Sequence, residues 1–250
     1  MSGHSKWHSI KHKKGAADKA RGKLFAKLIK QIEVAAREGG RDLEGNATLR
    51  AMVQKARDNS VPTDTIERAV KRGTGELEGV RYEPASYEGY ATGGVAVYVE
   101  CLTDNRNRTG QEIKNTFVRN GGSLAEPGAV AWQFERKGVI LIEKQAVTED
   151  DLMLAALDAG AEDIVDEGDT WRVTTAPTDM HAVRSAIEAA SIPITSADLT
   201  MLPTQTVPLT DEATARGVVR LIDALEDNDD VQAVYANFDI PDDVLQAVVA

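Results

Sequence analysis

The pattern of apolar residues in this 250-residue chain changes at Gly75, so two kinds of secondary structure must occur in one molecule. Before Gly75, apolar residues recur at helical spacing in three stretches, one around Leu28 and two that begin near Ala47 and Thr63. After Gly75, β-branched residues concentrate in strand-like runs such as 95–102. Helices followed by mixed strands and helices predict an α+β protein.

Glycines and polar residues mark where the first three helices should end. Gly39-Gly40 should end the first helix, and the segment 59–62 should break the second. Gly73 should lie just beyond the third helix as its cap. Residues 1–75 are therefore predicted to form a small helical domain with a basic leader.

The middle of the chain contains three further predicted elements. A strand over 95–102 precedes a helix that Thr109 should open, with Glu112 completing a capping box. Gly121-Gly122 should close that helix, and a second strand is expected over 130–135.

Residues 139–202 show the order strand, helix, strand, strand, helix, strand, which is the ferredoxin-like βαββαβ arrangement. The expected strands are 139–143, 164–165, 171–175 and 194–201, and the expected helices are 150–159 and 178–190, the latter capped by Thr178.

A helix over 211–228 and a strand over 231–238 have no sheet of their own, so we expect them to return to the sheet begun at residue 95. The predicted α+β fold is an N-terminal three-helix domain followed by two α/β sandwich domains, with the ferredoxin-like one inserted into the middle one. The predicted domains are 1–75 (basic, helical), 80–137 plus 207–250 (discontinuous α/β) and 138–206 (inserted, ferredoxin-like).

Charge divides at the same place as the hydrophobic pattern. The whole chain carries a formal charge of -11, yet residues 1–75 hold 17 basic and 8 acidic residues. Residues 76–250 hold only 12 basic and 32 acidic residues. A polyanion would be repelled by the acidic body and attracted to the N-terminal part, so this asymmetry indicates nucleic acid as the partner.

The leader contains Trp7 together with four lysines, Lys6, Lys11, Lys13 and Lys14. Ammonium groups bind phosphates without sequence preference, and an indole can stack on an unpaired base. The alternative is a solvated tail with Trp7 docked on the helical domain. A lysine stripe, formed by Lys23, Lys27 and Lys30, continues opposite the apolar face of the first helix. A membrane-surface helix over 23–37 is a weaker alternative because the stretch lacks a strong aromatic anchor apart from Phe25.

Two other groups have competing interpretations. His4, His8 and His12 would share a helical face, but no carboxylate or thiolate accompanies them, so we predict no metal and favour a phosphate or base contact. Arg106 and Arg108 lie where a strand meets a helix N-terminus and could clamp a phosphate. They could equally form a salt-bridged turn with Asp104.

Signals for catalysis are missing from the sequence. We find no Walker A, GxGxxG, HExxH or GxSxG motif. Cys101 lies in an apolar run, which favours a core position over a nucleophile. We predict no enzyme, no catalytic residue and no cofactor; an enzyme that uses the acidic surface is a remote alternative. The single cysteine favours a cytoplasmic location, and no apolar run approaches the roughly 20 residues of a membrane span.

Several long motifs resemble the YebC/PmpR family. They are GHSKW at 3–7, IKHKK at 10–14, RGK at 21–23, NSVPTDTIERAVKRG at 59–73, YEGY at 87–90, GGVAV at 93–97, ECLTDNRNRT at 100–109, NGG at 120–122 and VAW at 130–132. The match is close over about the first 140 residues and follows the layout of the family beyond them.

The resemblance implies three domains around a cleft and a non-enzymatic role in gene expression. Bacterial members are described as probable DNA-binding transcriptional regulators, mitochondrial relatives are translational activators, and bacterial members have also been linked to the ribosome. A bacterial cytoplasmic protein without a transit peptide is implied. The basic family residues carry over to Lys6, Lys11, Lys13, Lys14, Arg21, Lys23 and Lys27.

The predicted nucleic-acid contacts are therefore Lys6, Trp7, Lys11, His12, Lys13, Lys14, Arg21, Lys23, Lys27, Arg106 and Arg108. The expected partners are DNA, or ribosomal RNA on the ribosome, and basic ribosomal or transcription proteins that the acidic body could face. No membrane partner is expected.

Overall fold

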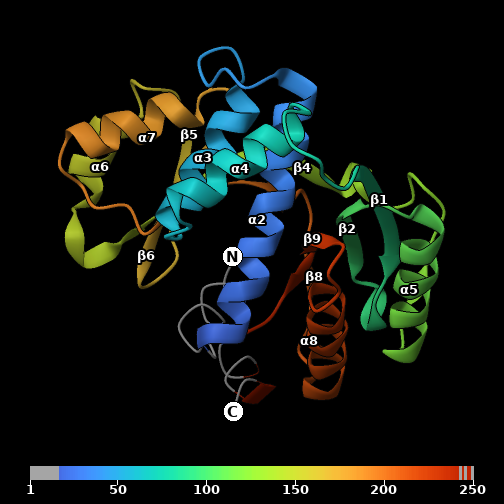
Figure 1. The fold of residues 1–250 in the computed structure, drawn as a ribbon. Helices are drawn as coiled ribbons and strands as arrows, with labels where there is room; N and C mark the ends of the chain where they lie inside the picture. The colour runs from blue at the N-terminus through green and yellow to red at the C-terminus, as the bar shows by residue number, and fades with distance from the viewer. Residues whose placement is uncertain (1–16, 242–243, 245–246, 249–250) are drawn as a thin grey trace. The chain divides into compact units, whose positions relative to one another are not determined.

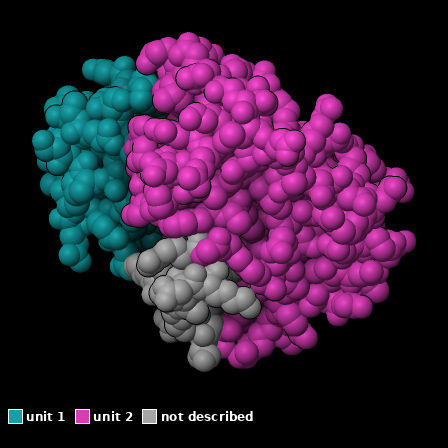
Figure 2. Space-filling view, viewed as in Figure 1, with its two compact units in different colours: residues 1, 134–204 teal, residues 2–133, 205–250 magenta. Residues whose placement is uncertain are grey.

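The computed structural model describes residues 17–241, 244 and 247–248, and their arrangement is drawn in Figure 1. The chain divides into two compact units (Figure 2). The larger unit contains residues 2–133 and 205–250, and the smaller unit contains residues 134–204.

Three helices open the larger unit, as the apolar spacing predicted: α2 (Ala17–Gly39), α3 (Ala47–Asp58) and α4 (Thr63–Gly73). Their apolar faces form one core in which Leu28 and Leu49 are almost fully buried. The stabilisation of each helix thus comes mainly from packing of its apolar face.

Two residues, Asn46 and Gly73, determine how these helices meet. The Asn46 side chain caps α3 by accepting from the Leu49 backbone N–H, and it donates to the carbonyl oxygens of Ala35 and Gly40 at 2.8 Å each. A Cβ on Gly73 would lie 2.4 Å from the backbone oxygen of Glu33, so this glycine allows α4 to approach α2. The expectation that Gly73 lies beyond the helix was wrong, because α4 includes it.

The α/β part of the larger unit is an antiparallel sheet in the order β3-β1-β2-β9. Its strands are β1 (Glu83–Tyr90), β2 (Ala96–Thr103), β3 (Ser123–Leu124) and β9 (Val231–Ala236). Since β2 pairs with β9, the C-terminal strand returns to the sheet as predicted.

Two helices, α5 (Arg106–Arg119) and α8 (Glu212–Glu226), contribute to the core of this sheet through Phe117, Leu221 and Ile222, all 0% exposed. A short parallel pair, β8 (Val207–Pro208) with β10 (Phe238–Asp239), completes this part.

The α/β part also differs from the sequence prediction in its details. Strand β1 was not predicted, because its residues EPASYEGY lack an apolar alternation. Helix α5 begins at Arg106 rather than Thr109, because Asn105 accepts a hydrogen bond from the backbone N–H of Arg108 and caps the helix earlier. The expected strand over 130–135 is a 3₁₀ turn, η2 (Ala131–Gln133), followed by β4.

The smaller unit confirms the ferredoxin-like prediction. Its elements are β4 (Phe134–Glu143), η3 (Lys144–Ala146), α6 (Glu149–Ala156), β5 (Ala161–Asp166), β6 (Thr170–Thr175), α7 (Met180–Ala189) and β7 (Ser196–Pro203). The strand order is β5-β6-β4-β7 and each pair is antiparallel. Thr148 caps α6, but Thr178 does not cap α7, which follows Asp179.

The fold class is thus an α+β arrangement with the ferredoxin-like unit inserted into the chain of the other α/β part. The helices of residues 17–73 belong to the same compact unit as the discontinuous sheet. The domain boundaries 1–75, 80–137 with 207–250, and 138–206 stay a prediction.

Cys101 is expected to be unreactive in the native protein. It lies on β2, its side chain is 2% exposed, and burial raises the pKa of its thiol to about 12. The thiol therefore stays protonated at pH 8, whereas the nucleophile is the thiolate. A disulfide reagent that releases a coloured thiol should therefore react with the protein only in denaturant; stoichiometric reaction under native conditions would contradict this placement.

Candidate nucleic-acid interface

The predicted contacts fall into three groups. Six of them lie outside the described residues: Lys6, Trp7, Lys11, His12, Lys13 and Lys14. Arg21, Lys23 and Lys27 lie on α2, and for Arg21 only the backbone is described. Arg106 and Arg108 lie in the first turn of α5.

The three lysines of the α2 stripe share one partner, an acidic segment formed by Glu226–Asp230 at the end of α8 and the turn after it. Their ammonium groups donate to five oxygens of this segment. Lys23 donates to the Asp227 backbone oxygen at 3.0 Å and to the Asp227 carboxylate, and Lys27 donates to the Glu226 backbone oxygen at 3.0 Å. Lys30 donates to the Asp229 backbone oxygen at 2.9 Å and to the Asp230 carboxylate at 3.3 Å.

This contact joins groups that are about 200 residues apart in the sequence. The final carbonyls of a helix carry partial negative charge, and the carboxylates of the acidic segment add full charges to it. The acidic segment therefore offers the lysines a row of carbonyl and carboxylate oxygens with partial or full negative charge, which resembles the row of oxygens that a phosphate backbone would offer them.

Asp230 is the most buried carboxylate of the acidic segment, with 8% of its side chain exposed. It accepts from the Arg108 guanidinium at 2.6 Å, from the Thr109 hydroxyl at 2.7 Å and from Lys30. Burial by itself would raise the pKa of Asp230, but the hydrogen bonds from Arg108 and Thr109 and the charge of Lys30 outweigh it. The pKa lies below its ordinary value. Asp230 thus connects α2 to α5 next to the start of β9.

Arg106 and Arg108 both have internal partners. Arg106 donates to the Pro84 backbone oxygen at 2.7 Å and lies 3.5 Å from the Glu83 carboxylate. Arg108 contacts the Asp104 carboxylate at 2.8 Å in addition to Asp230. The structure therefore shows the salt-bridged turn, and phosphate binding by these two arginines stays a prediction.

Three exposed cations were not singled out from the sequence: Arg57 on α3, and Arg68 and Lys71 on α4. None of them forms an ion pair with another residue of the described ranges. They lie away from the buried positions Ala56 and Ala69, so the same helical spacing that identified the core could have identified them.

Trp132 was also missed, although it lies in the motif VAW. Its side chain is 70% exposed and its indole N–H donates to the Ala129 backbone oxygen at 3.1 Å. The buried Glu88 carboxylate holds this loop by accepting the backbone N–H groups of Gly128, Val130 and Ala131 at 2.7–2.8 Å. An apolar triplet resembles a strand in the sequence, so only the structure could show that this tryptophan faces solvent.

The part of the chain that the structure describes contains neither a metal-binding cluster nor a membrane-spanning helix. No three His, Cys, Asp or Glu side chains gather there in a metal-binding arrangement, and His4, His8 and His12 lie outside it. No helix in the same residues is both long and apolar enough to cross a bilayer.

Comparison with known proteins relates both parts of the chain to one family. The model of the TACO1/YebC protein N-terminal domain matches residues 5–76, and that of the TACO1/YebC second and third domain matches residues 82–238. The chain is also similar in structure, with a TM-score of 0.82, to a conserved hypothetical protein from Aquifex aeolicus whose crystal structure is known. That protein is 45% identical, and the match covers 92% of this chain and 94% of the other.

Sequence relatives match over the whole length. A "Probable transcriptional regulatory protein" of Acidothermus cellulolyticus is 58% identical over 249 residues, which is 99% of this chain and 100% of the relative. A protein of the same name from Halothermothrix orenii is 54% identical over 250 residues, 99% of both chains. The chain therefore belongs to the TACO1/YebC family.

Proposed function

We propose that this protein is a nucleic-acid-binding regulator of gene expression that acts in the cytoplasm through its basic N-terminal region. The observation that carries the proposal is the charge division, with 17 basic and 8 acidic residues in 1–75 against 12 and 32 in the remainder. The names of the relatives, probable transcriptional regulatory proteins, support a role in regulation.

The target that we favour is DNA, which makes the protein a DNA-binding transcriptional regulator. The alternative is ribosomal RNA, with the protein acting as a ribosome-associated translation factor. The leader favours this alternative as much as DNA, because lysines close to a tryptophan suit structured or single-stranded RNA and need no groove-reading helix. The proposal includes no catalytic step.

The contacts of α2 indicate which cations contribute most to the affinity for nucleic acid. Lys23, Lys27 and Lys30 are already bonded to the acidic segment, so a phosphate at these lysines must replace its oxygens. Arg57, Arg68 and Lys71 need no such exchange. We therefore assign most of the affinity to the leader lysines and to these exposed cations, with the α2 stripe in competition with the acidic segment.

Neutralising two exposed carboxylates of the acidic segment, in the double variant Asp227→Asn and Asp229→Asn, is expected to strengthen nucleic-acid binding by about 3–10-fold at 0.1 M salt. Each exposed ion pair or nearby repulsion contributes roughly 0.2–1 kcal/mol. Fluorescence anisotropy with a labelled 20-nucleotide RNA and a 20-base-pair DNA measures the change.

The matched control is the double variant Asp150→Asn and Asp158→Asn, which changes the net charge equally with exposed residues of the smaller unit. If both double variants gain the same affinity, the effect is a general reduction of repulsion and the competition at α2 is wrong.

The proposal itself is tested by the salt dependence of binding by the full chain. Affinity should fall steeply between 50 and 300 mM KCl, with a slope that reports several phosphate contacts. Binding that is absent at 50 mM KCl for both probes would reject it. Two further experiments then separate the targets. In sedimentation of cell lysate with and without nuclease, co-migration with ribosomal subunits favours translation. In footprinting on DNA, a reproducible promoter footprint favours transcription.

A further inference from the structure

Helix α6 of the smaller unit is apolar on both of its faces. Leu152 and Ala156 face the core and are 0% exposed. On the outward face, Met153 and Leu154 are 39% and 79% exposed, and Leu157, the C-cap residue that follows the helix, is 44% exposed. The outward face of a surface helix is normally polar, so these three residues leave apolar area unpartnered.

This concentration is unusual for the molecule. Seven large hydrophobic side chains are exposed among the residues that the structure describes, and three of them lie on α6 and its C-cap residue. Scattered exposed apolar residues need no explanation, but a contiguous group on one helix face is typical of an interaction site.

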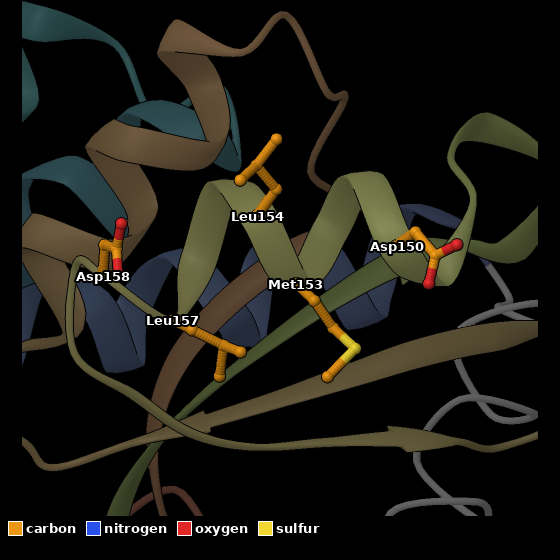
Figure 3. Close-up of a pocket in the computed structure, with 5 residues that line it drawn as sticks. All are labelled: Asp150, Met153, Leu154, Leu157 and Asp158. Atoms are coloured by element: carbon orange, nitrogen blue, oxygen red, sulfur yellow. The ribbon is translucent and has the colours of Figure 1, made fainter.

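The surface is hollowed on both sides of Leu154. One cavity of about 290 Å³ is lined by Asp150, Met153, Leu154, Leu157 and Asp158 (Figure 3). A second cavity, of about 410 Å³, lies between the η3 turn, α6 and the end of α7, and Leu154 and Asp151 contribute to it. Leu154 is therefore a ridge between two hollows, each of a size to receive an apolar side chain.

The negative charge around the outward face of α6 limits which partners can bind there. Figure 3 shows Asp150 and Asp158 at the two ends of the apolar row. Residues 134–204 hold 14 acidic and 5 basic residues, so the whole unit repels nucleic acid and anionic lipid. A complementary partner must bring apolar side chains together with positive charge.

We propose that the outward face of α6 is a docking surface for a basic amphipathic helix of another protein. That helix would place one apolar side chain in each hollow beside Leu154 and a lysine or arginine near each of Asp150 and Asp158. This inference does not depend on nucleic-acid binding by the N-terminal region. The small area makes the contact transient, with a micromolar dissociation constant that rises with salt.

The first test uses the full chain and a synthetic 14-residue amphipathic helix made only of leucine and lysine, labelled for anisotropy. We expect micromolar binding at 50 mM KCl. The double variants Leu154→Gln with Leu157→Gln, and Asp150→Lys with Asp158→Lys, should each weaken it by about tenfold or more. Because all four side chains are exposed, the variants should fold normally, and their melting temperatures check this.

The matched controls separate this face from nonspecific attraction. Leu77→Gln changes another leucine, 44% exposed, in the larger unit and should leave binding unchanged. A peptide in which glutamate replaces every lysine should not bind. Equal binding by that peptide, or by the α6 double variants, would overturn the proposal.

The second test places a photo-crosslinking amino acid at Leu154 in the full chain inside cells and maps the crosslinked peptide by mass spectrometry. A crosslink to a basic segment that contains apolar residues of another protein supports the proposal. A crosslink to a second copy of this chain, a crosslink to an acidic segment, or no crosslink above that of the same probe at Leu77 would overturn it.

Discussion

Replacing Lys11, Lys13 and Lys14 together with alanine is expected to weaken nucleic-acid binding by about 100-fold at 0.1 M salt. Each lysine that neutralises a phosphate releases counterions, so the slope of log affinity against log salt should fall by about 2–3 units for three contacts. The three lysines precede, in the sequence, every apolar residue of the helical core that the structure describes, so the melting temperature should stay nearly constant. Anisotropy titrations from 50 to 300 mM KCl give both the affinity and the slope.

The matched control removes three exposed basic residues of the α/β part, in the variant Lys114→Ala, Arg119→Ala and Arg220→Ala. It lowers the net charge equally, and we expect at most a threefold to fivefold loss of affinity from the weaker long-range field. If the leader variant keeps both its affinity and its salt slope, the leader is not the binding element and the assignment of its lysines is wrong.

The second large effect is expected from Asp230→Ala, which should lower the free energy of unfolding by about 2–3 kcal/mol at pH 7. Removing one partner of a buried pair leaves the others without compensation, at a cost of up to roughly 3–5 kcal/mol. We expect a smaller loss of stability here because two partners of Asp230 retain other contacts. Arg108 is partly exposed and keeps its ion pair with Asp104, and the Thr109 hydroxyl keeps its hydrogen bond to the Thr103 hydroxyl. Urea unfolding of the full chain, followed by circular dichroism, measures the difference.

The pH dependence of this difference has a defined sign. The pKa of Asp230 is lower in the folded protein than its ordinary value, so the stability it contributes is present above the unfolded pKa of about 3.9. It is lost as pH falls through the folded value. The gap between wild type and variant should be constant from pH 5 to 8 and should shrink below about pH 4.

Asp229→Ala is the matched control for stability, because the exposed Asp229 contributes only its backbone oxygen to Lys30. It should change the free energy of unfolding by less than about 0.5 kcal/mol. Equal destabilisation by both variants would mean that the acidic segment acts through its total charge and not through the network around Asp230.

Most of the fold could be predicted because its signals are local. Leu28 and Leu49 each belong to a stretch of apolar residues at helical spacing, and both are buried as that spacing indicates. The βαββαβ order follows from the apolar runs and the turn residues within 139–202. Strand β1 could not be predicted, since a half-exposed strand without β-branched residues is stabilised by its partners β2 and β3 and not by its own composition.

The candidate site was less predictable because its contacts also depend on tertiary structure. The lysine stripe of α2 is visible in the sequence as helical periodicity, but its partner lies about 200 residues away and is brought close only by tertiary structure. The spacing of Arg108 fits a phosphate clamp and a salt-bridged turn equally, and the position of Asp230 decides which arrangement the free protein has. Charge in a sequence therefore identifies the region, while contacts identify which cations are available.

The measurement that tests the central claim most directly is crosslink mapping of nucleic acid on the intact protein. Ultraviolet irradiation of the full chain bound to RNA, and separately to bromodeoxyuridine-substituted DNA, is followed by mass spectrometry of the adducts. We predict that adducts concentrate in residues 1–30 and around Arg57, Arg68 and Lys71, and that residues 134–204 carry none above background. Adducts concentrated in 134–204, with the N-terminal residues unmodified, would contradict binding through the basic N-terminal region.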